Sequence, residues 1–471
     1  MSDGRSLPKR VLEPVRSGSR AIRCGRAEIL FRQYCTKTNL EKVAMGHDLT
    51  KQYSVLFQKK GMKKVISLAQ DVYKFGKFRE MVSFAVWEAF HKLGLFPRKD
   101  YLVFDNRDTI LLENENLANP EFHEKVVQFF SSRGLEAVRC EHNWKLLFVN
   151  NSQEIFGCLY PDDRALYKSI DGGKSLTFLQ RFPEDIKSIF VSGQNTIFVC
   201  VKGSVYRSSD HGVSFKKTLD LGSSISFFRF NNAMTETPDK TLVIGEYGNI
   251  YDKNGWKKLA YLYYSSDDGE TWKTSDFLIQ KGTNKHVHIV KYSPLLHKLM
   301  LADGDNYKKL WLSDSLATFD FENPNWKPVN RFHIQMGGYT SVVESDGKIL
   351  FGTDYQGGTN FLVESADGEK FSRKIVPDPY RRSPIDNMVL RKSEGGSEIW
   401  ANLPFSTPNT KCLLMYSSDS GKSWNKVFDY RRSTHTVWLV SSSNKITEDL
   451  YFSVEDSKRN LRVVYKLADC K

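Results

Sequence analysis

A short motif recurs along the second part of this sequence, and it constrains the fold more than any other feature. Its pattern is S-x-D-x-G-x-[ST]-[WF]; three copies are complete, one ends in leucine instead of an aromatic residue, and two are degraded. The aspartates at its third position are Asp171, Asp210, Asp267, Asp314, Asp367 and Asp419, at intervals of 39, 57, 47, 53 and 52 residues. Intervals of about 40–50 residues are typical of propeller blades, so we expect a repeat fold.

Each part of the motif has a mechanical role in a tight turn. The aspartate carboxylate can accept hydrogen bonds from backbone N–H groups, and the glycine supplies a positive φ. The final aromatic side chain can close over the hairpin. The runs between the copies are short, rich in β-branched and aromatic residues, and separated by Gly, Asp, Asn and Ser, which favours strands over helices.

The motif resembles the Asp-box, or BNR repeat, of the sialidase-like β-propellers, and the resemblance covers about residues 139–471. It implies an all-β propeller of four-stranded blades, with the boxes on outer hairpins away from the active site. Six boxes and a boxless last unit at residues 436–467 predict seven blades, with six as the alternative.

The region before the propeller differs from it in charge and in hydrophobic periodicity. Residues 1–61 hold no strong periodicity; the first 60 carry 13 Lys and Arg against 5 Asp and Glu, a surplus of +8, and are expected to form a basic extension. Residues 62–138 form a predicted small helical region, because apolar residues recur there at three- and four-residue steps. Residues 101–112 are a predicted strand that could complete the last blade and close the ring.

Composition excludes several classes. The net charge is +13, yet no basic run is interleaved with stacking aromatics, so no nucleic-acid partner is expected. No apolar run approaches the ~18 residues of a membrane helix, so membrane insertion is not expected either. Seven scattered cysteines without a C-x-x-C favour reduced thiols and a cytoplasmic location. Phosphate-binding loops and the G-x-S-x-G elbow of serine hydrolases are also absent from the sequence.

Polar residues gather where the predicted inner strands begin and the second strands end. In a propeller these two places share one face, which the resemblance makes the ligand-binding face. The candidate catalytic residues at these positions are Glu246, Tyr247, His286, His288, Asp303, Asp305, Tyr339, Asp354 and His435. Asp, Asn and Gly also favour ordinary turns, so the single aspartates are the weaker part of this set.

The pair His286 and His288 is the most informative element, because the period of two in a strand points both side chains to one side. Two chemistries fit it. The imidazoles could hold a divalent metal together with Asp303, although no cofactor is required by the sequence. Alternatively, a neutral histidine could remove a proton beside a uronate carboxylate, assisted by nearby tyrosines, in a β-elimination.

We therefore expect a carbohydrate-active propeller whose partner is an acidic poly- or oligosaccharide, cleaved by elimination or by glycoside hydrolysis. One alternative is a non-catalytic propeller that binds a glycan or a protein, with the N-terminal region as a docking element. A sialidase-type hydrolase is a further alternative. That family uses an Arg-Ile-Pro motif before the first box, which this sequence lacks; its nearest look-alike is Arg181-Phe-Pro183, after the box.

Overall fold

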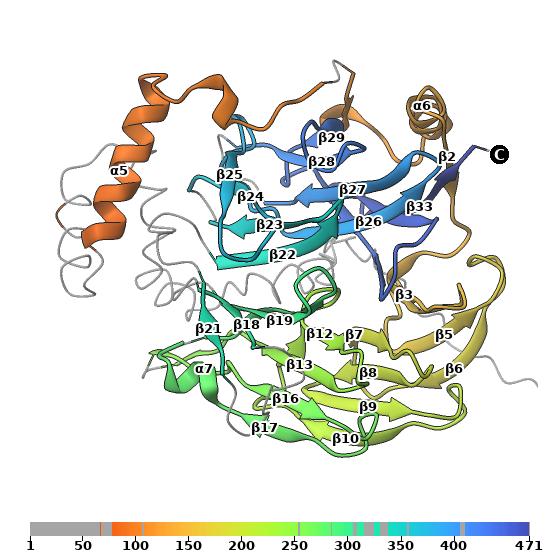
Figure 1. The fold of residues 1–471 in the computed structure, drawn as a ribbon. Helices are drawn as coiled ribbons and strands as arrows, with labels where there is room; N and C mark the ends of the chain where they lie inside the picture. Colours follow the sequence, from red (N-terminus) through yellow and green to blue (C-terminus); the bar gives the residue numbers. More distant parts are fainter. Residues whose placement is uncertain are drawn as a thin grey trace, which may run out of the picture. The chain divides into compact units, whose positions relative to one another are not determined.

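The computed structural model describes residue 66 and residues 78–470, except for 106–107, 253–254, 284, 305–308, 315–324, 330–337, 356–357 and 406–409. Within this part of the chain the sheets form seven blades in a ring, so the predicted β-propeller with seven blades is confirmed (Figure 1).

The first four blades follow one another along the chain, each with its innermost strand first. Blade 1 contains β3 (Trp144–Val149), β4 (Ile155–Leu159), β5 (Ala165–Ser169) and β6 (Thr177–Arg181). Blade 2 contains β7 (Ile186–Val191), β8 (Ile197–Val201), β9 (Ser204–Ser208) and β10 (Lys216–Asp220). Blade 3 contains β11 (Phe227–Phe228), β12 (Met234–Glu236), β13 (Leu242–Tyr247), β16 (Leu262–Ser265) and β17 (Lys273–Ser275). Blade 4 contains β18 (Val287–Ser293), β19 (Lys298–Asp303), β20 (Leu310–Leu312) and β21 (Lys327–Pro328).

Of the remaining three blades, blades 6 and 7 recruit strands from before the propeller. Blade 5 contains β22 (Gly338–Ser345), β23 (Lys348–Asp354), β24 (Phe361–Ser365) and β25 (Ser372–Ile375). Blade 6 contains β26 (Asn387–Ser393), β27 (Gly396–Leu403), β28 (Cys412–Ser417), β29 (Asn425–Tyr430) and the added strand β1 (Ile110–Leu111). Blade 7 contains β30 (His435–Leu439), β32 (Leu450–Asp456), β33 (Leu461–Asp469) and β2 (Leu135–Arg139), while β31 (Ser441–Ser443) joins blade 1. A separate hairpin pairs β14 (Tyr251–Asp252) with β15 (Gly255–Trp256).

The ring is closed by β2, which lies before the propeller in sequence and pairs antiparallel with β33 over five residue pairs. Figure 1 shows the two strands side by side near the C-terminus. The segment 101–112, which the sequence suggested for this role, was the wrong choice. Its strand β1 pairs with β29 in blade 6, and Tyr101 forms a bridge to Ile375 in blade 5. Closure leaves fewer exposed sheet edges for unwanted pairing.

In the described residues, three α-helices accompany the sheets: α5 (Phe78–Lys92), α6 (Pro120–Ser131) and the short α7 (Phe277–Gln280). Two 3₁₀ turns, η1 (Arg98–Asp100) and η2 (Leu112–Asn114), lie between the first two helices. The Asn119 side chain caps α6 by accepting a hydrogen bond from the Glu121 N–H at 3.1 Å, and Pro120 occupies the first helical position. Four phenylalanine and valine side chains of α6 are buried in the core shared with blades 6 and 7.

Five box motifs form the turns that their residue types predict, namely those at Asp171, Asp210, Asp267, Asp367 and Asp419. The copy at Asp314 continues into residues 315–324, outside the described residues. In blade 3 the Asp267 carboxylate accepts hydrogen bonds from the Thr271 backbone N–H at 3.0 Å and the Thr271 hydroxyl at 2.6 Å. Gly269 has φ of +83°, and a Cβ there would lie 2.3 Å from the Phe198 ring of blade 2. The turn joins the two outer strands β16 and β17, so the box holds neighbouring blades together at the rim.

Candidate functional site

Blades 3, 4 and 5 meet at the ends of their inner strands, and there two imidazoles lie side by side. His286 directly precedes β18 and His288 lies within it; both side chains are buried. Their Nε2 atoms are 3.0 Å apart, and their ring centroids are 5.0 Å apart. Gly304 permits this packing, because a Cβ at that position would come within 2.4 Å of the His286 ring.

The hydrogen bonds of the two Nδ1 atoms fix the tautomers. His286 Nδ1 lies 2.8 Å from the Gly248 carbonyl oxygen, and His288 Nδ1 lies 3.1 Å from the Tyr339 carbonyl oxygen. A carbonyl oxygen can only accept, so both Nδ1 atoms carry a proton and donate it. The two facing Nε2 atoms would otherwise oppose lone pair to lone pair at 3.0 Å. This short distance therefore requires one proton, or another electron-pair acceptor, between the two Nε2 atoms.

Tyr247 covers the pair. This residue ends β13, and its ring centroid lies 4.0 Å from that of His286 and 5.8 Å from that of His288. The Arg229 guanidinium lies 5.9 Å from the Tyr247 ring centroid. Tyr247 is partly exposed, whereas both imidazoles are buried.

Arg229 bridges three blades, which the sequence analysis did not foresee. The guanidinium donates to the Thr340 carbonyl of blade 5 at 2.6 Å and to the Asp386 carboxylate before blade 6 at 2.8 Å. Its neighbour Asn231 donates to the Asn387 side chain at 3.1 Å and accepts from the Ser442 hydroxyl at 3.0 Å. One sequence feature could have indicated these contacts, namely the Asn-Asn pair at 231–232. This pair interrupts the apolar inner strand of blade 3 between β11 and β12.

Two predicted carboxylates, Glu246 and Asp303, are buried and engaged by other groups. Glu246 accepts hydrogen bonds from the Gly222 N–H at 3.0 Å, the Ser226 hydroxyl at 2.5 Å and the Tyr263 hydroxyl at 2.7 Å. Asp303 accepts from the Lys309 N–H at 2.8 Å and, more weakly, from Trp311 Nε1 at 3.4 Å. Burial raises the pKa of Asp303 to about 6, although these hydrogen bonds and the nearby His288 act in the opposite direction.

The other predicted residues are placed as follows. Tyr339 contributes its carbonyl to His288, whereas its ring is buried in the core 5.0 Å from the Phe351 ring. Asp354 ends β23, opposite Gly338 in the ladder. His435 begins β30 in blade 7, opposite Asp456, and burial lowers its pKa. Asp305 lies outside the described residues.

Metal binding and the sialidase alternative can each be compared with this geometry. Among the described residues, no three His, Cys, Asp or Glu side chains are grouped so as to hold a metal ion. Of the propeller arginines, Arg229 pairs with Asp386, Arg381 and Arg382 share Glu88, Arg391 pairs with Glu398 and Asp469, and Arg431 pairs with Glu113. Arg432 donates to the Pro404 carbonyl, and Arg331 lies outside the described residues.

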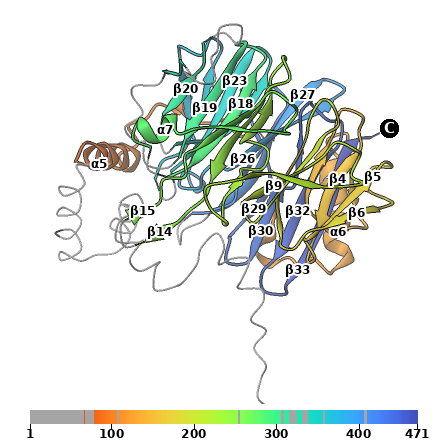
Figure 2. The same ribbon diagram turned by 90° about the horizontal axis from the view of Figure 1, so that it is seen from below.

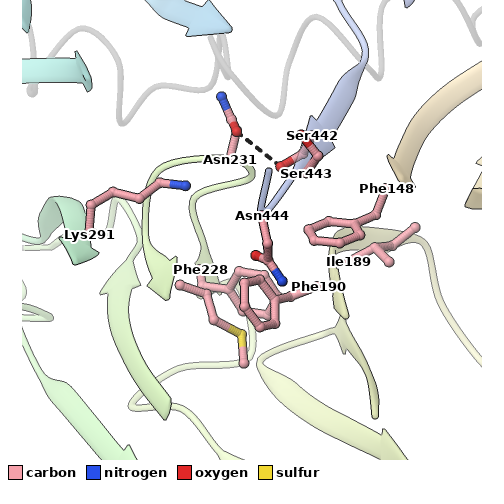
Figure 3. A pocket seen from close by; sticks show the side chains of 10 residues that line it. Phe148, Ile189, Phe190, Phe228, Asn231, Lys291, Ser442, Ser443 and Asn444 are labelled. Atoms are coloured by element: carbon pink, nitrogen blue, oxygen red, sulfur yellow. Dashed lines mark hydrogen bonds between the residues drawn. The ribbon is translucent and has the colours of Figure 1, made fainter. Parts of the chain in front are cut away.

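A second polar cluster lines a small cavity between the inner strands (Figure 3). Lys291 of β18 faces this cavity, and burial lowers the pKa of its ammonium group to about 8. In the part of the chain that is described, no hydrogen bond or ion pair to the Lys291 ammonium is found. The other lining residues are Phe148, Ile189, Phe190, Phe228, Asn231, Met234, Ser442, Ser443 and Asn444.

Comparisons with known proteins concern the fold. No protein-family model and no curated protein matches the sequence. Among solved structures, a streptogramin B lyase is similar with a TM-score of 0.48 and 12% identity, over 71% of this chain and 96% of the lyase chain. YCF48 from Cyanidioschyzon merolae is similar with a TM-score of 0.44 and 12% identity, over 70% and 98% of the two chains. A luciferin-regenerating enzyme has a TM-score of 0.38 and 12% identity, over 71% and 95%. No described helix is both long and apolar enough to cross a membrane.

Proposed function

We propose that this propeller cleaves an acidic poly- or oligosaccharide by β-elimination, with His286 and His288 as the proton-transfer groups. The observation that carries the proposal is the 3.0 Å separation of the two Nε2 atoms while both Nδ1 atoms donate to carbonyls. In such a pair one Nε2 atom carries a proton and the other keeps its lone pair, so a proton donor and a proton acceptor lie side by side.

Elimination needs both of these. In a uronate, the base removes the proton from the carbon next to the carboxylate, the electron pair forms a C4–C5 double bond, and the bond from C4 to the glycosidic oxygen breaks. One Nε2 would accept the carbon-bound proton, and the proton already held by the pair would pass to the departing oxygen. The pair ends with the same number of protons that it had at the start.

Two further groups support an acidic substrate at this place. The Arg229 guanidinium lies beside Tyr247 and offers positive charge near the reacting carbon, although it is also bound to Asp386. The partly exposed Tyr247 ring supplies a flat apolar surface on which a sugar ring can stack. Tyr247 must turn aside before a substrate reaches the Nε2 atoms, because both imidazoles are buried.

The experiment is a panel of uronate polymers incubated with the purified full chain. Elimination gives an unsaturated product that absorbs near ~235 nm, whereas hydrolysis gives new reducing ends without this absorbance. We expect His286→Ala and His288→Ala each to lower the elimination rate by about 10²–10⁴-fold. His211→Asn, on an exposed box turn of blade 2, is the matched control and should retain the native rate. Equal activity of all four proteins would refute the proposed roles.

A non-catalytic binding propeller is the second candidate. It is favoured by the Tyr247 ring over the pair and by the Arg229 and Asn231 contacts, which link blade 3 with blades 5 and 6 and with strand β31 of the blade 1 sheet. Binding of a uronate oligosaccharide in calorimetry, without product at ~235 nm or new reducing ends, would favour this candidate over the lyase.

A further inference from the structure

The second surface of interest lies on α5 and on the turn that follows it. Residues of α5 that face the propeller are Phe84, Trp87, Glu88 and His91, and the opposite side of the helix carries exposed apolar side chains. This opposite side consists of Phe78, Val82, Val86 and Phe90, with exposed fractions between 41% and 63%. Spacing by four residues places these side chains along one face.

The propeller-facing side holds the helix firmly. The buried Glu88 carboxylate accepts hydrogen bonds from Arg381 at 2.6 Å and from Arg382 at 2.5 Å, which belong to the segment between blades 5 and 6. Trp87 stacks on Phe96 at 4.6 Å and meets Phe361 of blade 5 edge to face at 5.2 Å. The exposed face therefore belongs to a helix whose other side is bound to the propeller. Figures 1 and 2 show where α5 lies in the fold.

The turn after the helix extends this face. Gly94 has φ of +65°, and the Leu95 N–H donates to the Phe90 carbonyl at 2.9 Å, which is the bond of a Schellman cap. The cap fixes Leu93 and Leu95 in positions where 70% and 56% of each residue is exposed. Three exposed basic residues flank these leucines, namely Lys92, Arg98 and Lys99.

An exposed apolar helix face that is bordered by cations fits the interface of an anionic lipid bilayer. The apolar side chains can enter the boundary between headgroups and acyl chains, while the cations remain at the level of the phosphates. A soluble protein seldom exposes so many neighbouring large apolar side chains without a partner. We propose that α5 and the 93–99 turn bind the protein peripherally to a membrane surface rich in anionic lipid, without spanning it. This inference is independent of the proposed lyase activity.

The test is cosedimentation of the full chain with vesicles of phosphatidylcholine alone, and of phosphatidylcholine mixed with phosphatidylglycerol. The native protein should pellet with the mixed vesicles, and less so at high salt because the cations are then screened. The double variant Leu93→Asp and Leu95→Asp should lower the bound fraction at least about ten-fold. Both side chains are largely exposed, so the variant should unfold at the same temperature as the native protein.

A matched control separates the apolar contact from net charge. Ile170 and Val213 are 74% and 82% exposed on box turns of blades 1 and 2. The double variant Ile170→Asp and Val213→Asp changes the net charge by the same amount and should bind vesicles within about two-fold of the native protein. Equal loss in the two variants, or no pelleting of the native chain, would overturn the proposal. The alternative outcome is that the native protein binds no vesicles but forms a dimer in light scattering. If only the Leu93 and Leu95 variant abolishes that dimer, the face binds a second copy of this chain instead of a membrane.

Discussion

The two imidazoles differ from ordinary buried histidines in what their Nε2 atoms face. Each Nδ1 is satisfied by a carbonyl, but each Nε2 meets another nitrogen acceptor at 3.0 Å. The Tyr247 ring covers this arrangement, and this contact can be removed without touching the imidazoles. Tyr247 is therefore the side chain at which access to the pair can be tested.

Tyr247→Ala should make the pair reachable by small reagents. We expect diethyl pyrocarbonate, followed at its histidine absorbance band, to modify two more histidines in this variant than in the native protein. Tyr247→Phe keeps the ring and should react as the native protein does. No additional modification in the alanine variant would show that another part of the chain closes the pair.

Lys291 provides a prediction on pH, because its ammonium lies in a cavity between the inner strands. Burial lowers its pKa to about 8 in the folded state from an ordinary value near 10.5. Between these values the unfolded chain binds more protons at this residue than the folded protein, so this residue makes stability rise as pH rises from 8 to 10.5. The uncompensated charge opposes folding below pH 8.

Lys291→Met keeps a similar length without the charge. Urea unfolding at pH 7 should therefore show a higher midpoint for this variant than for the native protein, and the difference should shrink as pH approaches 10.5. The exposed Lys422→Met on a box turn is the control and should show neither effect. A difference that stays constant with pH would mean that the charge of Lys291 does not matter.

The outer hairpins of the blades are the elements in which sequence and structure agree most closely. The Asp267 turn contains the predicted hydrogen bonds and the predicted positive φ at Gly269. Slight burial raises the pKa of Asp267, but hydrogen bonds from Thr271 and Ser265 outweigh it and lower the pKa to about 2. Stability from this carboxylate is present above pH 4 and is lost as pH falls through about 2.

Asp267→Ala should destabilise the protein by about 1–2 kcal/mol, because the turn N–H groups lose their acceptor. The measurement is the free energy of unfolding in urea at pH 7. Glu394→Ala, on an exposed hairpin of blade 6, should change it by less than about 0.5 kcal/mol. Similar values for the two variants would contradict a stabilising role for the box.

The site was less predictable than the hairpins, for reasons that particular residues make clear. The Nε2 atoms of His286 and His288 lie 3.0 Å apart, but His286 precedes β18 and the ladder shifts register between Val287 and Ile289, so regular alternation alone does not account for the pair. Alternation along β13 does separate Glu246 from Tyr247, which the prediction had grouped. The Arg229 contact with Asp386 joins residues 157 positions apart, and no local pattern encodes such a pair. The closing strand was misplaced because residues 101–112 and 135–139 both have strand-like patterns, and only packing chooses between them.

At the level of the whole molecule, blade 7 joins the two ends of the ring. Glu136 of β2 and Ala468 of β33 are direct neighbours in the antiparallel register. A disulfide between cysteines at these positions would close a very long loop and should raise the free energy of unfolding by about 3–5 kcal/mol. The comparison is between the oxidised and reduced Glu136→Cys, Ala468→Cys protein, with Cys470 replaced by serine to prevent mispairing. No difference between the two states would contradict the expected stabilisation by closing the loop between β2 and β33.

The position of β2 also has a consequence for biosynthesis. This strand leaves the ribosome long before β33, its only neighbour in the sheet order of the described chain. During translation, the side chains of Leu135 and Ala137, which are buried in the folded protein, remain without their final packing partners until six blades have been synthesised. The nascent chain therefore carries an unsatisfied apolar strand for most of its synthesis, a natural place for a chaperone to act.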